Sequence, residues 1–314
     1  MLSLLGGIFL GWSLGANDAA NAFGPAVASR MLKFWYAAVV AAVFVLLGAL
    51  AEGQAPIETL KSLTSLSLKQ AIVSSVAAAA TVTLMTLFGF PVSTSQAVVG
   101  GILGIGFMNR QLDLSAMGKV LICWLGTPIG GLLIAVVLLK ILGRIYNRLN
   151  IDLFQSDILL RVLLIAAGSY AAYALGANNV ANVTAVFVGA GQLSIFWAKW
   201  IGGLSIAFGI ITFSMPVMET VGKKLVPLDP FSALIVVLAE AITVHAYTLV
   251  GVPVSTSQAM IGAVLGVGLV KGINTVSRQT LAGILLAWFL TPTIACFISI
   301  ALYFVVNLRY VPSG

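Results

Sequence analysis

The stretch Gly15-Ala16-Asn17-Asp18-Ala19-Ala20-Asn21-Ala22-Phe23-Gly24-Pro25 decides how the rest of the chain is interpreted. It lies within an apolar run from Met1 to Ser29, which is long enough to cross a lipid bilayer. A charged side chain at that depth costs roughly 2.5–3.5 kcal/mol, so Asp18 marks a candidate functional site. We expect Gly24-Pro25 to break the helix, and a bilayer tolerates broken backbone only where it lines a cavity.

The pattern returns 161 positions later as Gly176-Ala177-Asn178-Asn179-Val180-Ala181-Asn182, with Asn179 in place of Asp18. A second motif, Pro-Val-Ser-Thr-Ser-Gln, occurs at 91–96 and again at 253–258. The chain therefore divides into two related halves. We place the first repeat at 1–150, with its Asn motif at 15–25 and a hairpin at 70–108, and the second at 151–314, with its motif at 176–186 and a hairpin at 231–270.

Composition places the chain in a membrane. Of its 314 residues, 60% are hydrophobic and only 8% are charged, with a mean hydropathy of +1.10, whereas a soluble domain carries about 25% charged residues. The net charge of +7 is not a nucleic-acid signal, because basic residues in short connections set membrane topology. We expect a multi-pass protein of the cell (inner) membrane with the lipid bilayer, and no nucleic acid, as its partner.

The two hairpins predict the architecture. The apolar run from Ala97 to Met108 is too short to cross a bilayer, because a span needs about 20 residues. We therefore interpret 70–108 as a re-entrant helical hairpin. If each hairpin returns to its own side, each half crosses three times, and the second half is inverted relative to the first. The predicted fold is an all-α polytopic membrane protein of two inverted-topology repeats, each with a broken first helix, full spans and a hairpin, as in many secondary transporters.

The hairpin tips suit an anion. The hydroxyls after each proline are typical helix caps, so each tip presents a half-helix N-terminus, with its partial positive charge and free N–H groups, at membrane depth. Inversion lets two such ends face one point. The candidate anion ligands are Ser93, Thr94, Ser95, Gln96, Ser255, Thr256, Ser257 and Gln258.

The Asn motifs suit a cation, because their side chains and freed carbonyls supply oxygen ligands. The candidate sodium ligands are Asn17, Asp18, Asn21, Asn178, Asn179 and Asn182. No Lys or Arg lies in any of the four motifs, so an anion there must be balanced by dipoles and bound cations. A doubly charged phosphate beside Asp18 needs roughly two or three sodium ions. This favours cation-coupled anion symport.

The Asn motif at 15–24 and its echo at 176–182 resemble the signature of the inorganic phosphate transporter (PiT) family, and the tips at 91–96 and 253–258 resemble that family's hairpins. The resemblance spans the whole chain. It implies a sodium- or proton-coupled phosphate symporter that is dimeric, and we expect sodium coupling and alternating access. By position, it implies coupling ions at Asp18 and the Asn residues. It implies phosphate at the tip residues Thr94, Ser95, Gln96, Thr256, Ser257 and Gln258. Many relatives have Asp where this chain has Asn179, and an acid where it has Val45. These departures leave the number and identity of the coupling ions open, proton coupling included. Sulfate carriers are also known within the family, so sulfate stays open as the substrate.

Two other classes are less consistent with the motifs. A channel for a neutral solute does not need Asp18, and no constricting Arg is evident. An intramembrane hydrolase built on Ser93 or Ser255 lacks a nearby base, because His245 lies ten residues before Ser255. We therefore expect no enzymatic activity.

Three further polar residues lie outside the motifs. Glu240 and His245 precede the second tip, at positions that Ala78 and Thr83 occupy in the first repeat. A proton relay through the sole histidine is one interpretation. The sequence favours a packed or interfacial role for His245 and an interfacial role for Glu52, and it leaves the role of Glu240 open.

Overall fold

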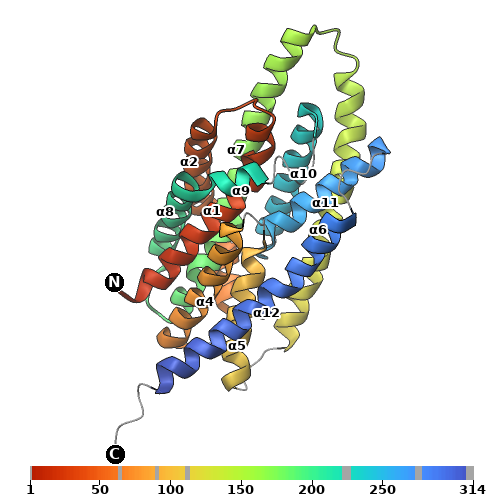
Figure 1. Ribbon diagram of the computed structural model, residues 1–314. Helices are drawn as coiled ribbons and strands as arrows, with labels where there is room; N and C mark the ends of the chain where they lie inside the picture. The colour runs from red at the N-terminus through yellow and green to blue at the C-terminus, as the bar shows by residue number, and fades with distance from the viewer. Residues whose placement is uncertain are drawn as a thin grey trace, which may run out of the picture.

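The structure is a computed structural model that describes residues 2–62, 66–88, 92–109, 114–220, 228–272 and 278–308. Every regular element in these ranges is helical, which confirms the all-α prediction. After a short 3₁₀ turn at Leu2–Leu4, the first half forms α1 (Leu5–Ala28), α2 (Phe34–Glu52), α3 (Gln54–Ser62), α4 (Leu68–Leu87), α5 (Thr94–Asn109) and α6 (Leu114–Tyr146) (Figure 1). The second half forms α7 (Leu153–Gly189), α8 (Ile195–Phe213), α9 (Met215–Thr220), α10 (Pro230–Leu249), α11 (Thr256–Lys271) and α12 (Arg278–Leu308).

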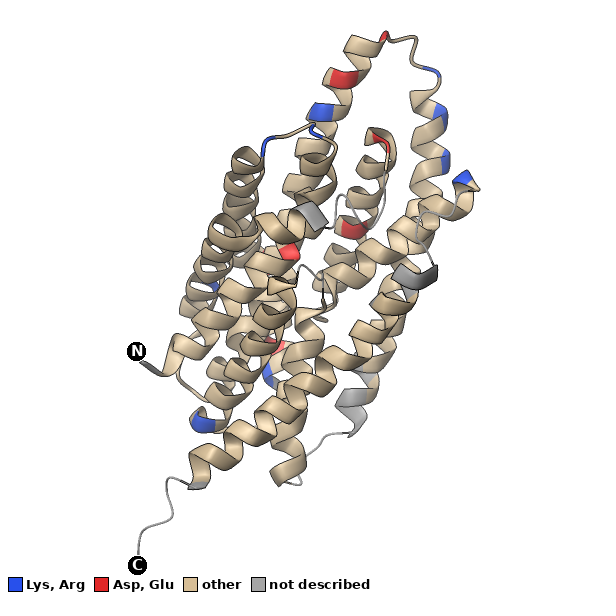
Figure 2. Cartoon of the chain, in the orientation of Figure 1, with Lys and Arg blue, Asp and Glu red and all other residues tan. Residues whose placement is uncertain are grey.

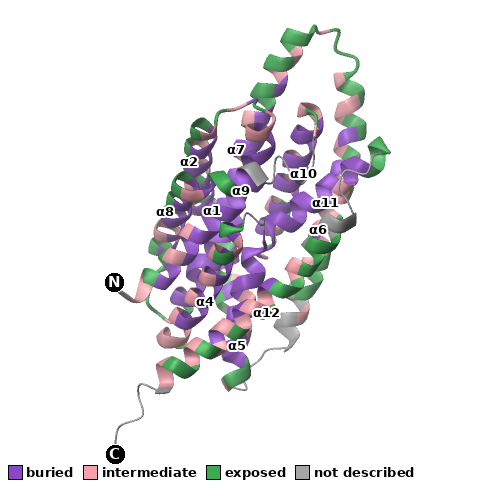
Figure 3. Cartoon of the chain, viewed as in Figure 1, coloured by how far each residue is buried: buried purple, intermediate pink, exposed green. Residues whose placement is uncertain are grey.

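Seven of the described helices are long and apolar enough to cross a membrane: α2, α4, α6, α7, α8, α10 and α12. The glycines, asparagines and Asp18 of α1 lower its hydropathy, so it is not among the seven although it has 24 residues. Lysine and arginine gather toward the two ends of the bundle (Figure 2). Outer helices such as α2, α8 and α12 expose apolar side chains, whereas the centre is buried (Figure 3). The chain is a multi-pass membrane protein.

The two halves are repeats of one another, element for element. Hairpin α4–α5 enters from one end of the bundle and hairpin α10–α11 from the other, so their tips meet in the middle (Figure 1). This arrangement confirms the inverted repeats. Residues 89–91, which include Pro91, lie outside the described residues. That each hairpin re-enters the membrane, and the six crossings that this implies, stay predictions.

Each half holds the hairpin of the other. The long helix α6 packs along α11, and α12 packs along α5. Glycines allow this close approach, since a Cβ on Gly262 would lie 2.0 Å from the Pro128 carbonyl oxygen and one on Gly100 would lie 2.2 Å from that of Pro292. The two hairpins are therefore clamped in equivalent ways by exchanged partners.

The predicted break in the first helix of each repeat is wrong. Helix α1 continues through Pro25 to Ala28, and α7 continues through its Asn motif. Pro25 lies in the last turn, where the bond it removes affects only the end of the helix. The interruption lies instead in the second helix of each repeat, at Gly53 between α2 and α3 and at Ser214 between α8 and α9.

We expect Gly48→Ala to destabilise the fold. Its new Cβ would lie 2.0 Å from the backbone oxygen of Tyr173, so α2 and α7 must separate. Overpacking of this kind typically costs about 1–3 kcal/mol, which should lower the melting temperature in detergent. The control is Gly143→Ala, whose Cβ meets only Phe231 at 3.9 Å. Equal melting temperatures for the two variants would contradict the close crossing.

Candidate functional site

All fourteen predicted site residues are described, and all are buried. The first asparagine of each motif holds the tip of its own hairpin. Asn17 Nδ2 donates to Thr86 Oγ1 at 2.9 Å, and Asn17 Oδ1 accepts from the backbone N–H of Val92 at 3.0 Å. This amide therefore joins the end of α4 to the residue that leads into α5. Asn17 positions the tip, whether or not it also binds an ion.

The second repeat has the same joint. Asn178 Nδ2 donates to Thr248 Oγ1 at 2.8 Å, and Asn178 Oδ1 accepts from Val254 N at 2.8 Å. The sequence analysis did not identify Thr248 or its counterpart Thr86. Their equal spacing from the two tips was the signal available, since each threonine precedes its Pro-Val-Ser-Thr-Ser-Gln motif by the same distance.

The two tips bind each other reciprocally. Ser95 Oγ donates to the carbonyl oxygen of Val254, and Ser257 Oγ donates to that of Val92, each at 3.1 Å. Four residues from opposite halves thus form one symmetric contact. The expectation that two half-helix ends meet at a central point is confirmed.

The first serine of each tip caps a helix, as expected. Gln96 N donates to Ser93 Oγ at 3.2 Å, and Gln258 N donates to Ser255 Oγ at 3.3 Å. Helices α5 and α11 therefore both begin at the centre of the molecule. Their positive N-terminal ends attract an anion to this point.

Helix α1 contacts both hairpins here. Asp18 Oδ1 accepts a hydrogen bond from Thr94 Oγ1 at 3.2 Å, and the Thr256 side chain hydrogen-bonds the same carboxylate. Asn21 Nδ2 lies 3.2 Å from Thr256 Oγ1 and 3.0 Å from Ser257 Oγ. Asp18 thus contacts both tips, and Asn21, one turn later, contacts the second tip.

Helix α7 makes the uncharged counterpart. Asn182 Nδ2 donates to Ser95 Oγ and to Asn179 Oδ1, both at 2.8 Å. Each Asn motif therefore reaches across to the tip of the opposite repeat. The centre contains one acid in the motif of α1 and none in the motif of α7, so the site is symmetric in shape but not in charge.

Several buried polar atoms have no partner among the described residues. Four are oxygens: Asn21 Oδ1, Gln96 Oε1, Gln258 Oε1 and Glu240 Oε2; three are nitrogens: Asn179 Nδ2, Trp124 Nε1 and Trp288 Nε1. A buried polar atom without a partner costs about 1–3 kcal/mol, so those on the Asn motifs and the tips mark a candidate ligand site. The oxygens of Asn21, Gln96 and Gln258 fit a hard cation, and the Asn179 amide can donate to an anion. The two tryptophans lie on α6 and α12, outside these motifs.

Glu240 adds a second carboxyl group to the centre. It lies on α10, is 1% exposed and interacts electrostatically with Asp18. No lysine or arginine is buried in the described part of the chain. Two buried carboxyl groups without a basic partner need cations or protons to neutralise them. The sequence left the role of Glu240 open, although an acid in an apolar 20-residue helix was a usable signal.

We expect Asn178→Ala to loosen the second tip. The substitution leaves the buried Val254 N–H without its partner, which costs about 1–3 kcal/mol, and it removes the bonds that the amide donates to the Thr248 hydroxyl and the Val252 carbonyl. The melting temperature in detergent should fall. Gln54→Ala is the control, because it removes only an exposed bond to Glu58. An unchanged melting temperature for Asn178→Ala would show that the tip does not depend on this amide.

Known proteins resemble the chain along its whole length. It is 31% identical over 306 residues to the Putative phosphate permease of Methanocaldococcus jannaschii, covering 98% of this chain and 96% of that one. It is 29% identical to the protein of that name in Thermococcus kodakarensis, covering 96% of each. A solved structure described as "The sodium-dependent phosphate transporter" shares the fold, with a TM-score of 0.88, 24% identity and 98% of each chain covered. The sequence pattern of the phosphate transporter family matches residues 14–159 and again 151–299, so the chain belongs to the phosphate transporter family.

Proposed function

We propose that the chain is a secondary active transporter that carries inorganic phosphate together with sodium ions across the cell membrane by alternating access. The observation that carries this proposal is the composition of the centre. Two helix N-termini meet there beside two carboxyl groups and four unpartnered oxygens, with no buried basic residue among the described ones. Such a centre attracts an anion by dipoles and holds it only when cations accompany it.

Phosphate binds at the tips in this mechanism. The N-terminal N–H groups of α5 and α11 and the hydroxyls of Ser93, Thr94, Ser255 and Thr256 supply neutral donors. Ser95 and Ser257 donate to carbonyl oxygens of the opposite tip in this structure. When the tips separate, these two hydroxyls become available to phosphate.

Sodium binds between the tips and the Asn motifs. Asp18, Glu240 and the unpartnered oxygen of Asn21 are hard ligands of the type that Na⁺ prefers. The solved relative is described as sodium-dependent, which supports sodium as the coupling ion. Because the carboxylates and phosphate carry the same sign of charge, bound sodium lowers the cost of bringing phosphate in, and phosphate in turn tightens sodium binding.

The inverted repeats supply the alternation. Since the two hairpins enter from opposite ends, loosening one opens the centre to one side and loosening the other opens it to the opposite side (Figure 1). The tip-to-tip bonds keep both routes closed at once. In this mechanism the centre opens to one side at a time, so each ion is bound, enclosed and then released. A channel, in contrast, is open to both sides at once.

Proton coupling is the second candidate, and the electrostatic interaction between the buried carboxyl groups of Glu240 and Asp18 favours it. A proton on one of two interacting carboxyl groups removes their repulsion, as a bound sodium ion does. Sulfate has the same tetrahedral shape as phosphate and is the alternative substrate. The homodimer stays a prediction from the family resemblance.

Uptake of radiolabelled phosphate into proteoliposomes tests the proposal. The vesicles carry an inward gradient of Na⁺, of H⁺ or of neither, and sulfate is added as a competitor. We expect a sodium gradient to drive saturable phosphate accumulation that excess sulfate does not reduce. Accumulation driven by protons alone would replace sodium, and strong competition by sulfate would replace phosphate. Flux that never exceeds equilibration would indicate a channel.

We expect Asp18→Asn to weaken sodium-driven uptake roughly 10–100-fold, the size of a lost interaction with a charged group. The fold should persist, because the second repeat already has Asn179 at the equivalent position. The control is Asp157→Asn, which removes an exposed ion pair with Arg161 far from the centre. The sodium dependence of uptake and the sodium-induced rise in melting temperature are the measurements. Full sodium stimulation in Asp18→Asn would exclude Asp18 as a ligand.

A further inference from the structure

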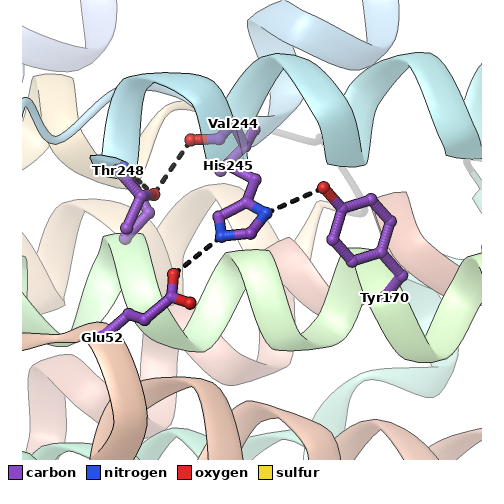
Figure 4. A network of polar contacts seen from close by, with 6 residues as sticks. Glu52, Tyr170, Val244, His245 and Thr248 are labelled. Carbon is purple, nitrogen blue, oxygen red and sulfur yellow. Dashed lines mark hydrogen bonds and ion pairs between the residues drawn. The ribbon is translucent and has the colours of Figure 1, made fainter. Parts of the chain in front are cut away.

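The sole histidine joins three helices outside the central site. His245 of α10 places Nε2 2.7 Å from Glu52 Oε2 at the end of α2, and Nδ1 2.8 Å from the Tyr170 hydroxyl of α7 (Figure 4). Its ring also lies edge-on to Tyr170 and Tyr173. The Tyr173 side chain hydrogen-bonds Glu52. The sequence placed both Glu52 and His245 at interfaces and did not connect them.

The first repeat builds the same joint without a titratable group. Thr83 of α4 occupies the position of His245, and its hydroxyl lies 2.6 Å from that of Ser13 on α1. Tyr170, Tyr173 and Glu52, which surround the second hairpin's histidine, correspond by repeat position to Phe9, Trp12 and Phe213, which stack on one another. The positions that correspond to the histidine, the glutamate and the two tyrosines therefore hold no titratable group. A contact that only holds helices together does not need a histidine and a glutamate at these positions.

The chain Tyr170–His245–Glu52 keeps its hydrogen bonds in both charge states of the ring. With a neutral ring, the tyrosine hydroxyl donates to Nδ1, and Nε2–H donates to the carboxylate. With a charged ring, Nδ1–H donates to the tyrosine oxygen instead, because a hydroxyl can both donate and accept. Addition of a proton therefore breaks no bond and converts the contact with Glu52 into an ion pair.

The described residues around His245 offer no other titratable partner than Glu52 and the two tyrosines. Among the described residues, the titratable groups that reach His245 from neighbouring helices are Glu52 of α2 and the two tyrosines of α7. On α10 itself, Glu240 is buried and interacts electrostatically with Asp18 of α1, and the Tyr247 hydroxyl lies against Gly126 of α6. Lys199 of α8 is nearby but donates to the Leu50 carbonyl oxygen at 2.6 Å.

We propose that Tyr170, His245 and Glu52 form a proton-binding site that latches the second hairpin to α2 and α7, separate from the central ion and phosphate site. The inference rests on the proposed function in one respect, because it assumes that α10 moves during transport. A histidine ordinarily changes charge between pH 5 and 8. The charged contact is stronger than the neutral one, so acid slows release of the second hairpin and leaves the first hairpin unaffected.

The test compares wild type with His245→Gln, which keeps a polar side chain but binds no proton in this range. Maximal phosphate uptake rates are measured for both in proteoliposomes from pH 5 to 8. The ratio of the two rates cancels the titration of phosphate itself. We expect the wild-type rate, relative to the variant, to fall roughly fivefold from pH 8 to pH 5, the difference between a neutral and a charge-assisted hydrogen bond.

Thr83→Val is the matched control, since it removes the equivalent contact at the first hairpin. It should change the rate by the same factor at every pH. Glu52→Gln should flatten the pH response as His245→Gln does. A ratio of wild type to His245→Gln that stays constant across the range would overturn the proposal and leave His245 as a simple tether.

A second measurement does not depend on transport. Because the chain has one histidine, protein labelled with ¹³C-histidine and purified through a histidine-free tag gives a single ring signal in nanodiscs. We expect both ring forms between pH 5 and 8, with less of the charged form in Glu52→Gln. Absence of a charged form in that range would overturn the proton site. If the vesicles take up no phosphate while the signal behaves as expected, the proposed function fails and the proton site stands.

Discussion

The rest of the structure depends on the contact between the two hairpin tips. Ser95 and Ser257 each donate to the backbone of the opposite tip, and Asn17 and Asn178 fix each tip to its own hairpin. These bonds are buried, so each of the groups that form them needs a protein partner or a ligand. The tips can separate only when something else satisfies the groups that are released. This requirement links movement of the hairpins to occupation of the centre.

The charges in the centre also need partners. The described residues bury two carboxyl groups and no basic side chain there, and the helix N-termini contribute only partial charge. In the proposed mechanism, cations neutralise Asp18 and Glu240, and the helix dipoles together with those cations hold the anion. A buried lysine would supply a full positive charge that holds an anion without a second ion. The neutral character of Thr94, Gln96 and their repeat partners is therefore as important as the presence of Asp18.

Sequence patterns predicted a large part of this arrangement because they are local. The two Asn motifs, the two tips and the length of the apolar runs were enough to predict two inverted repeats and a central meeting point. The position of the helix break was wrong. Pro25 falls in a last turn that tolerates it. At Gly53, where α2 ends, a Cβ would lie 2.5 Å from Val180 of α7, a contact that the local sequence does not reveal. The pair formed by Glu52 and His245 was missed for a similar reason. The spacing of residues along one helix does not reveal which residue of a helix in the other half it will contact.

The exchanged packing of the long helices has a consequence for how the protein is made. Helix α5 lies along α12, which is synthesised much later than α5 because the second hairpin lies between them in the chain. Until α12 is present, the backbone of α5 at Gly100 lacks the Pro292 backbone against which it packs. The first hairpin is thus synthesised early, and its packing partner α12 follows only with the second half. Each half is a unit of sequence, but the packing of its hairpin is completed by the other half.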